Sequence, residues 1–323
     1  MQNCYLEKRD RLPKSISVAV PCYNEEEVIS ETYKRLKAIL DKINIPYEII
    51  FVDDGSKDST WSLISSFSKN DKTVKAVKLA RNHGHQFALT CALDQSKGEV
   101  VLIIDADLQD PPELLDEMIK KWKEGYYVIY GQRIARDGES LSKKFFAFAF
   151  YRVISKISKI NIPQDTGDFR LIDRKALDVL LSMRETQRFI RGMVAWVGFP
   201  QTPLPYHRAE RFAGTTKYPF KKSLLLAFDA ITSFSYAPLR LATYLGMFFS
   251  VISFLYFMVV IVLKFMGINF PGYTSLMGAI LMLGGIQLIV LGIIGEYVGR
   301  IFEQGQKRPL YIIQDIKGEP FEE

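Results

Sequence analysis

Two aspartates one residue apart are the residues of this sequence best suited to chemistry. Asp105 and Asp107 directly follow the apolar run 100–104. A run of aliphatic residues without polar alternation predicts a strand buried on both faces, as in parallel α/β sheets. Ligands of such sheets bind beyond the carboxyl ends of the strands, where two carboxylates could join Mg²⁺ or Mn²⁺ to a substrate diphosphate. The alternative is a pair of acids that only ends a strand and begins a turn.

Two more polar segments follow predicted strands. Pro21, Tyr23 and Glu25 come after strand 15–20, and Asp53 and Asp54 come after strand 47–52. Carboxylates at a strand end can accept hydrogen bonds from a nucleotide base or a ribose hydroxyl. Each segment alone is equally consistent with a helix cap or a turn. Three acidic strand ends at one sheet edge together indicate a ligand site.

The elements that must position these residues alternate between strand and helix. Strands are predicted at 15–20, 47–52, 74–79, 100–104 and 127–130, and helices at 25–40, 58–67, 85–95 and from 112. This rhythm predicts a doubly wound, mostly parallel α/β sheet covered by helices. The absence of GxGxxG and P-loop motifs argues against a classical dinucleotide fold and an NTPase. Helices at 141–157 and 221–236 either lie in the membrane interface or pack into a core.

The C-terminal third is strongly apolar. The chain combines 48% hydrophobic with 24% charged residues, which indicates a polar globular part joined to an apolar part. Residues 241–263 and 276–294 contain no Asp, Glu, Lys or Arg. Each is about long enough to cross a hydrocarbon core of about 30 Å. We therefore predict a juxtamembrane amphipathic helix at 221–238, membrane spans at 239–265 and 273–299, and a cytoplasmic tail at 300–323, with buried soluble helices as the alternative.

Basic residues predict the orientation. Lys and Arg residues flank both spans, and the connection between the spans holds only Lys264, at its edge. By the positive-inside rule both ends of the hairpin face the cytoplasm. The N-terminus has no stretch resembling a signal peptide, so the N-terminal domain is expected to be cytosolic. The net charge of +6 fits an anionic leaflet. Nucleic acid is not an expected partner because no basic-aromatic module is recognisable.

Taken together, the motifs resemble a known enzyme family. Segments 21–25, 52–58, 81–82 and 105–113 are similar to the GT-A-fold family 2 glycosyltransferases. Segment 166–171 and the two spans resemble the polyprenyl-phosphate glycosyltransferases, which include dolichyl-phosphate mannose synthase and the GtrB-type bactoprenol glucosyltransferases. The resemblance covers nearly the whole chain and assigns 1–220 to a GT-A domain. The hairpin is closest to the GtrB-like branch.

The resemblance implies a role for each motif residue. Asp168 takes the position of the catalytic base, although a phosphate acceptor that is largely ionised at neutral pH scarcely needs one, so a positioning role stays open. Asp105, Asp107 and Gln109 are implied at the metal ion. Nucleotide-sugar binding is implied for Pro21, Tyr23, Glu25, Asp53, Asp54, Arg81, Ala106 and Arg133, and phosphate or acceptor binding for Arg133, Arg211, Thr216 and Lys217.

The implied reaction is the metal-dependent, inverting transfer of one sugar to polyprenyl (undecaprenyl) phosphate at the cytoplasmic face of the plasma membrane. It gives a β-linked lipid product and a nucleoside diphosphate. UDP-glucose is the expected donor. UDP-GlcNAc, UDP-aminoarabinose and GDP-mannose are alternatives. The spans suggest a homo-oligomer, with a tetramer among the candidates.

Two other functions, and a metal site at one histidine pair, are less consistent with the sequence. A processive polysaccharide synthase is disfavoured because segment 187–191 departs from the Gln-x-x-Arg-Trp motif and two spans cannot form a polymer channel. A catalytically silent membrane scaffold or nucleotide-sugar sensor is disfavoured by the presence of Asp105, Asp107 and Asp168. For His83 and His85, hydrogen bonding within a loop is favoured over a metal pair.

Overall fold

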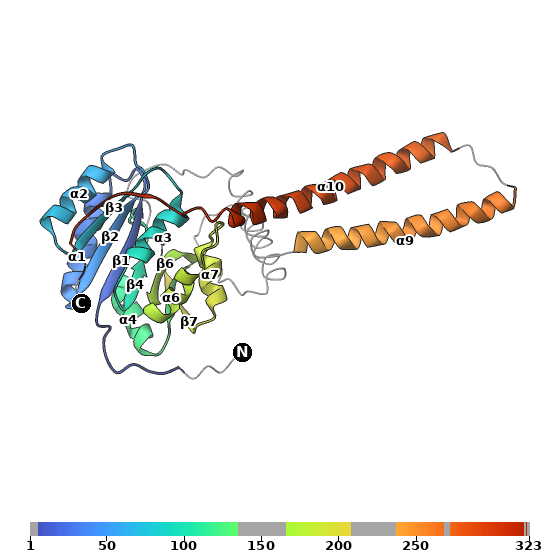
Figure 1. The fold of residues 1–323 in the computed structure, drawn as a ribbon. Helices are drawn as coiled ribbons and strands as arrows, with labels where there is room; N and C mark the ends of the chain where they lie inside the picture. The colour runs from blue at the N-terminus through green and yellow to red at the C-terminus, as the bar shows by residue number, and fades with distance from the viewer. Residues whose placement is uncertain (1–5, 135–165, 208–236, 268–271, 320, 322–323) are drawn as a thin grey trace. The chain divides into compact units, whose positions relative to one another are not determined.

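The computed structural model describes residues 6–134, 166–207, 237–267, 272–319 and 321 (Figure 1). The chain divides into two compact units. One unit contains the sheet and its helices and includes the residues after 308. The other contains the apolar helices between 237 and 308. The predicted helices at 141–157 and 221–236 lie outside the described residues.

The first unit is built on an eight-stranded sheet. Its order is β7-β5-β6-β4-β1-β2-β3-β8. Strands β1 to β4 are mutually parallel, β5 is parallel to β7, and only β6 and β8 run against their neighbours. The prediction of a mostly parallel α/β sheet is confirmed. The bounds are β1 Ile16–Cys22, β2 Tyr47–Asp53, β3 Val74–Leu79, β4 Val100–Ile103, β5 Val128–Arg133, β6 Thr166–Asp173, β7 Gln201–Tyr206 and β8 Ile313–Lys317.

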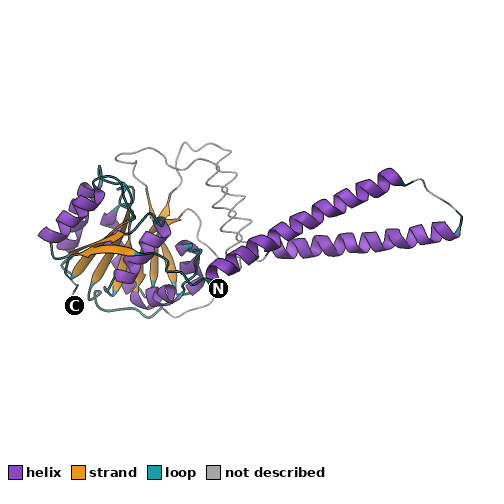
Figure 2. Ribbon diagram, turned by 45° about the horizontal axis from the view of Figure 1, so that its top comes forward, coloured by secondary structure: helices purple, strands orange, loops and turns teal. Residues whose placement is uncertain are grey.

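Helices cover both faces of this sheet (Figure 2). One core joins alternate residues of the strands to α1, α2 and α4, with the fully buried Trp122 among them. Helix α3 packs on β1 and β2 and contacts α6. The bounds are α1 Ile29–Ile43, α2 Thr60–Asn70, α3 His85–Gln95, η1 Pro112–Leu114, α4 Leu115–Lys123, α6 Arg174–Ser182 and α7 Ile190–Val197. Helices α1 and α2 begin later than the predicted starts at 25 and 58, because the residues before them bond to each other across two loops. The Glu25 amide donates to Thr60 Oγ1, and the Glu26 amide donates to Asp58 Oδ2.

Strand β6 runs antiparallel to the other strands in the middle of the sheet. It lies between β4 and β5 and is antiparallel to both, with Ile103 paired to Arg170. The first residues of β6 therefore lie at the same edge as the carboxyl ends of β1, β2 and β4. Continuing the register by two residues sets Asp105 opposite Asp168. Strand β6 is not among the strands predicted from the sequence.

The segment assigned to a cytoplasmic tail at 300–323 is more structured than predicted. Helix α10 continues to Gly305, and β8 then pairs with β3 at the edge of the sheet. The Ala80 amide donates to the Ile312 carbonyl at 2.9 Å, and the Tyr311 hydroxyl donates to Asp94 Oδ2 at 2.7 Å. The edge strand forms because β3 presents unpaired backbone groups that another strand can satisfy.

The second unit contains the two long apolar helices, α9 (Ala237–Phe265) and α10 (Tyr273–Gly305), which form a hairpin (Figure 1). Both pass the length and composition test for a membrane span, over Ala242–Leu263 and Gly278–Gly305. Among the described residues of these two ranges, only Ala242 is buried, and the others are partly or fully exposed. Large apolar side chains exposed along two whole helices are unlike the core helices of a soluble fold and mark a surface that needs an apolar environment.

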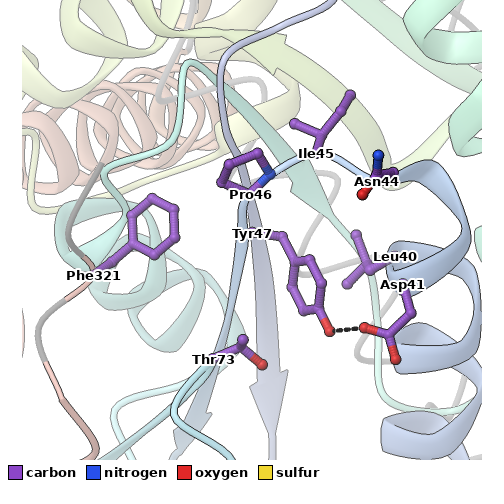
Figure 3. A pocket seen from close by; sticks show the side chains of 8 residues that line it. All are labelled: Leu40, Asp41, Asn44, Ile45, Pro46, Tyr47, Thr73 and Phe321. Carbon is purple, nitrogen blue, oxygen red and sulfur yellow. Dashed lines mark hydrogen bonds between the residues drawn. The ribbon is translucent and has the colours of Figure 1, made fainter.

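A polar cluster holds the opposite end of β2, away from the acidic strand ends. Tyr47, at the start of β2, donates a hydrogen bond to Asp41 in a pocket shared with Pro46 and Phe321 (Figure 3). Next to it, Asp71 accepts hydrogen bonds from the Tyr33 hydroxyl at 2.8 Å and the Thr73 hydroxyl at 2.7 Å, and pairs with Lys37 at 2.7 Å. Burial raises the pKa of Asp71, but the opposite effect of these partners is larger, so the pKa is lowered to about 2.

This cluster makes stability depend on the charge of Asp71. The folded pKa lies below the ordinary value of 3.8, so the stabilisation is fully present above about pH 4 and is lost as the pH falls through about 2. The shift corresponds to about 2 kcal/mol at neutral pH. We expect Asp71→Asn to lower the thermal midpoint of the full chain in detergent by roughly 4–8 °C at pH 7. Asp116→Asn, an exposed carboxylate on α4, is the control; an unchanged midpoint in Asp71→Asn would mean that the cluster adds no stability.

Candidate active site at the carboxyl edge of the sheet

The loops after β1, β2 and β3 form one wall at the carboxyl edge. The Asn24 amide donates to Ser56 Oγ at 2.9 Å, and Asn24 Oδ1 accepts from the Lys57 amide at 2.9 Å. Gly55 has φ +67°, and a Cβ there would lie 2.7 Å from backbone atoms of Arg81 and Asn82. Only glycine allows this close approach with a positive φ. The three loops are therefore held as a unit.

Asp53 and Asp54, at the end of β2, have different environments. Asp53 is fully buried; its Oδ1 accepts from the Ser56 amide at 3.1 Å, and Oδ2 has no hydrogen-bond partner in the described part of the chain. Burial raises the pKa of Asp53. Both oxygens of Asp54 accept backbone hydrogen bonds, from His83 at 2.7 Å and Gly84 at 2.9 Å. Asp53 thus keeps one buried oxygen without a hydrogen bond among the described residues, whereas Asp54 fixes the loop that leads into α3.

The segment after β4 turns sharply at the same edge. Leu108 has φ +58°, and the Gln109 amide donates to Asp107 Oδ1 at 3.1 Å. Thr32 of α1 donates to the Ala106 carbonyl at 2.8 Å, which anchors the turn. Asp105 Oδ1 is buried and has no hydrogen-bond partner among the described residues. Burial, together with neighbouring carboxylates, raises the pKa of Asp105 to about 6.

Asp168 is buried and surrounded by cationic and amide groups. Its Oδ1 lies 3.1 Å from Arg191 Nε, and its Oδ2 lies 3.2 Å from His85 Nε2 and accepts from Gln86 Nε2 at 3.3 Å. Arg170, which is almost fully buried, approaches to 3.9 Å. Burial raises the pKa of Asp168, but Arg191, His85 and Arg170 hold it well below its usual range. Asp168 is therefore ionised at any ordinary pH.

His85 has a different position from the one expected for it. His85 is the first residue of α3, as the helix predicted at 85–95 implies, but its side chain turns toward the carboxylates instead of bonding within the loop. Its Nε2 lies 3.7 Å from Asp105 Oδ1 as well as 3.2 Å from Asp168 Oδ2. Burial lowers the pKa of His85, but the opposite effect of Asp168 and Asp105 is larger, so the pKa is raised to about 9. The imidazole is therefore a cation between two carboxylates at neutral pH.

Arg133, at the end of β5, lies against the start of β6. A Cβ on Gly167 would come 2.5 Å from Arg133 Nη2, so the guanidinium rests on the glycine next to Asp168. Arg133 Nε donates to the Tyr206 hydroxyl at 3.4 Å, and that hydroxyl donates to Asp110. This chain of contacts joins the ends of β5 and β7 to the turn after Asp107.

The structure brings together most of the residues that the sequence singled out. Pro21 is buried at the end of β1, Tyr23 and Glu25 are partly exposed just beyond it, and Arg81 is exposed after β3. Arg211, Thr216 and Lys217 lie outside the described residues. The sequence patterns do not single out Gln86, Asp110, Arg191 and Tyr206. The motif segment 105–113 contains Asp110, but no local pattern marks the other three, because their roles depend on strand and helix placement.

The chemistry of the donor set fits a divalent cation. No group of three His, Cys, Asp or Glu side chains with metal-binding geometry occurs among the described residues. Mg²⁺ does not need one, because it commonly binds one or two carboxylates together with substrate phosphates. Asp105 offers a buried oxygen without a hydrogen bond, and Asp107 is two residues away on the same turn. A carboxylate whose charge is disfavoured by burial is stabilised by a cation.

Comparison with known proteins agrees with this geometry. Residues 17–181 match the model of Glycosyl transferase family 2, and residues 237–301 match that of the GtrB C-terminal hairpin. The chain is 50% identical over 94% of both sequences to the uncharacterized glycosyltransferase YkcC of Bacillus subtilis. It is 41% identical to the bactoprenol glucosyl transferase of Shigella phage SfV, over 94% of this chain and 99% of that one.

Among solved structures, mannosyl-3-phosphoglycerate synthase from Rubrobacter xylanophilus is 16% identical and has a TM-score of 0.47, over 68% of this chain and 72% of that chain. The family match covers half of the sequence and includes β1 to β4, the acidic turn after β4 and β6 with Asp168. The hairpin match covers α9 and most of α10. The chain therefore belongs to glycosyl transferase family 2 and has the GtrB type of C-terminal hairpin.

Proposed function

We propose that this glycosyltransferase moves one glucose from UDP-glucose to a polyprenyl phosphate, such as undecaprenyl phosphate, with inversion at the anomeric carbon and with a divalent cation. The observation that carries the proposal is the register that sets Asp168 of β6 opposite Asp105 after β4. In this register the turn with Asp105 and Asp107, which is suited to a metal–diphosphate, lies beside Asp168. Arg191, His85 and Arg170 approach that carboxylate. Relatives named bactoprenol glucosyl transferase support the sugar and the lipid.

The donor side comprises the loops after β1, β2 and β4. Asp53 Oδ2, buried and without a hydrogen-bond partner in the described chain, would accept a hydrogen bond from the nucleotide base. Tyr23 and Glu25, partly exposed at the end of β1, would contact the base or ribose. Asp105 and Asp107, with Gln109 close by, would hold Mg²⁺ or Mn²⁺. When bound, the ion supplies Lewis-acid stabilisation of the leaving diphosphate.

The acceptor side comprises the cationic groups around Asp168. An oxygen of the acceptor phosphate attacks the anomeric carbon from the face opposite the diphosphate, the bond from carbon to diphosphate oxygen breaks, and UDP leaves. Arg133 and Arg191 would orient the phosphates through charge-assisted hydrogen bonds. With a pKa held well below its usual range, Asp168 is a weak base, so we assign it to positioning rather than to proton abstraction.

The lipid acceptor is consistent with the hairpin and with its connection to the sheet. Because β8 follows α10 and pairs with β3, both ends of the hairpin must reach the side of the membrane that holds the sheet. Two crossings satisfy this requirement. The basic residues that flank both spans support the cytoplasmic side. We further propose that the protein is a homo-oligomer, with a tetramer as the arrangement to test.

The test is transfer of radiolabelled glucose from UDP-glucose to undecaprenyl phosphate by the purified full chain in detergent. We expect label in the lipid phase with Mg²⁺ or Mn²⁺ and its loss with EDTA. Parallel reactions with UDP-GlcNAc, UDP-aminoarabinose and GDP-mannose identify the donor. Transfer from one of these alone would replace glucose in the proposal, and absence of transfer from every donor by folded protein would overturn it.

A further inference from the structure

Among the described residues, the side chain of His85 lies within 4 Å of both carboxylates of the site. His85 Nε2 is 3.2 Å from Asp168 Oδ2 and 3.7 Å from Asp105 Oδ1. Asp105 belongs to the acidic turn assigned to the donor, and Asp168 belongs to the acceptor side. The imidazole therefore lies where the two halves of the site meet. Its side chain is 39% exposed, whereas that of Asp168 is 5% exposed, so one side of the ring remains open to a ligand.

The backbone fixes the position of this imidazole. Gly84, with φ +103°, precedes His85, and both carboxylate oxygens of Asp54 accept from the His83 and Gly84 amides. Helix α3 begins immediately afterwards and packs on β1 and β2. The ring thus projects from a loop pinned to the end of β2, on a helix packed against the centre of the sheet. A side chain held in this way has little freedom to move away from Asp168.

The next residue adds a second contact to the same oxygen. Gln86 Nε2 donates to Asp168 Oδ2 at 3.3 Å, and Gln86 Oε1 accepts from the Ile190 amide at 3.0 Å. Gln86 therefore connects Asp168 to the first residue of α7, the helix that also carries Arg191. His85 differs because it alone in this pair also approaches Asp105. Gln86 can hold Asp168 when the His85 side chain is removed. It cannot fix the position of Asp168 relative to Asp105, because only His85 of this pair approaches Asp105.

We propose that His85 is a positioning residue for sugar transfer, which sets the placement of Asp168 relative to Asp105 through Nε2. The inference rests on the proposed function for its kinetic consequence. The imidazole holds the acceptor-side carboxylate at a fixed distance from the turn that receives the diphosphate, so that the acceptor phosphate and the anomeric carbon meet in line. Misplacement by about 1 Å can cost on the order of 10²-fold in rate.

The first experiment separates positioning from donor binding. We expect His85→Ala to lower kcat about 10- to 100-fold while the KM for UDP-glucose changes less than about threefold. We expect calorimetric affinity for UDP in the presence of Mn²⁺ to change equally little. His85→Gln keeps a side-chain donor and should recover a large part of kcat. His83→Ala, two residues earlier, is the control and should match the wild type.

Two outcomes of this experiment would overturn the inference. One is a wild-type kcat in His85→Ala. The other is a parallel loss of kcat and UDP–Mn²⁺ affinity that His85→Gln does not restore, because it would mean that the ring only maintains the fold of the donor turn.

The second experiment does not depend on transfer. In a double-mutant cycle, the thermal midpoints of His85→Ala, Asp168→Asn and the double variant are compared in detergent with EDTA. Residues in contact give non-additive effects, so we expect the double variant to melt higher, by about 2–4 °C, than the sum of the single shifts predicts. Additive shifts would overturn the contact. If no donor supports transfer by the wild type but the cycle is non-additive, the proposed function fails and the placement of Asp168 by His85 stands.

Discussion

Asp105→Asn is expected to lower kcat for sugar transfer by on the order of 10³-fold and to leave the protein folded. The substitution keeps the size of the side chain and removes the charge that would hold the divalent cation. Metal stabilisation of a leaving group amounts to several kcal/mol, and about 1.4 kcal/mol corresponds to a factor of ten in rate. The measurement is radiolabel transfer at saturating UDP-glucose over a range of Mn²⁺ concentrations.

The same substitution should change stability in the opposite direction. Burial raises the pKa of Asp105 to about 6, above its ordinary 3.8, so ionisation at pH 7 destabilises the metal-free fold. We therefore expect the thermal midpoint of Asp105→Asn in EDTA at pH 7 to equal or exceed that of the wild type. The gain should disappear below about pH 4, where the carboxyl is protonated in both states. Asp116→Asn is the control, and an Asp105→Asn enzyme within tenfold of wild-type kcat would exclude this carboxylate from the catalytic machinery.

Asp168→Asn is expected to lower both activity and stability. Arg170 is 3% exposed, and Arg191 lies 3.1 Å from the carboxylate, so removal of the negative charge leaves buried positive charge uncompensated. Breaking a buried ion pair in this way typically costs about 3–5 kcal/mol. The effect on kcat should be on the order of 10²- to 10³-fold, because the acceptor phosphate loses the arrangement of groups that orients it.

The pH profile distinguishes positioning from general-base catalysis by Asp168. Its pKa lies well below the ordinary range, so it stays ionised from about pH 4 upward and contributes no limb there. At saturating Mn²⁺, which would keep Asp105 ionised, the acceptor phosphate with its second pKa of about 6 should make the wild-type rate rise with pH through that value. A positioning role predicts the same midpoint and a lower plateau in Asp168→Asn. Recovery of the Asp168→Asn rate at high pH would instead indicate that a base had been removed.

Local sequence was sufficient for the centre of the sheet. The apolar run at 100–104 and the one that ends at Asp53 predicted β4 and β2 within a residue or two, because strands buried on both faces leave a continuous hydrophobic signal. The acidic residues after them were correctly placed at one edge, since parallel strands end on the same side. The residues that we propose for the donor side therefore followed from short-range patterns.

The acceptor side required information that no short segment contains. Strand β6 was expected only as a motif, and its pairing with β4 is set by the register of Ile103 with Arg170. The neighbours of His85 along the chain favour hydrogen bonding within a loop, because nothing in them indicates Asp168, which is distant in sequence. Strand β8 has five residues of alternating exposure, too short a pattern to separate an edge strand from a polar tail.

Strand β8, which completes the sheet beside β3, follows the apolar hairpin in the chain. A ribosome releases β3 well before β8, and the whole apolar hairpin lies between them in the chain. During that interval β3 is an open sheet edge that other chains could extend. With the two crossings proposed above, β8 reaches this edge only after the hairpin has returned to its starting side. Under that topology a chain with a single crossing would keep the edge of β3 open, so completion of the sheet would depend on correct insertion of the hairpin.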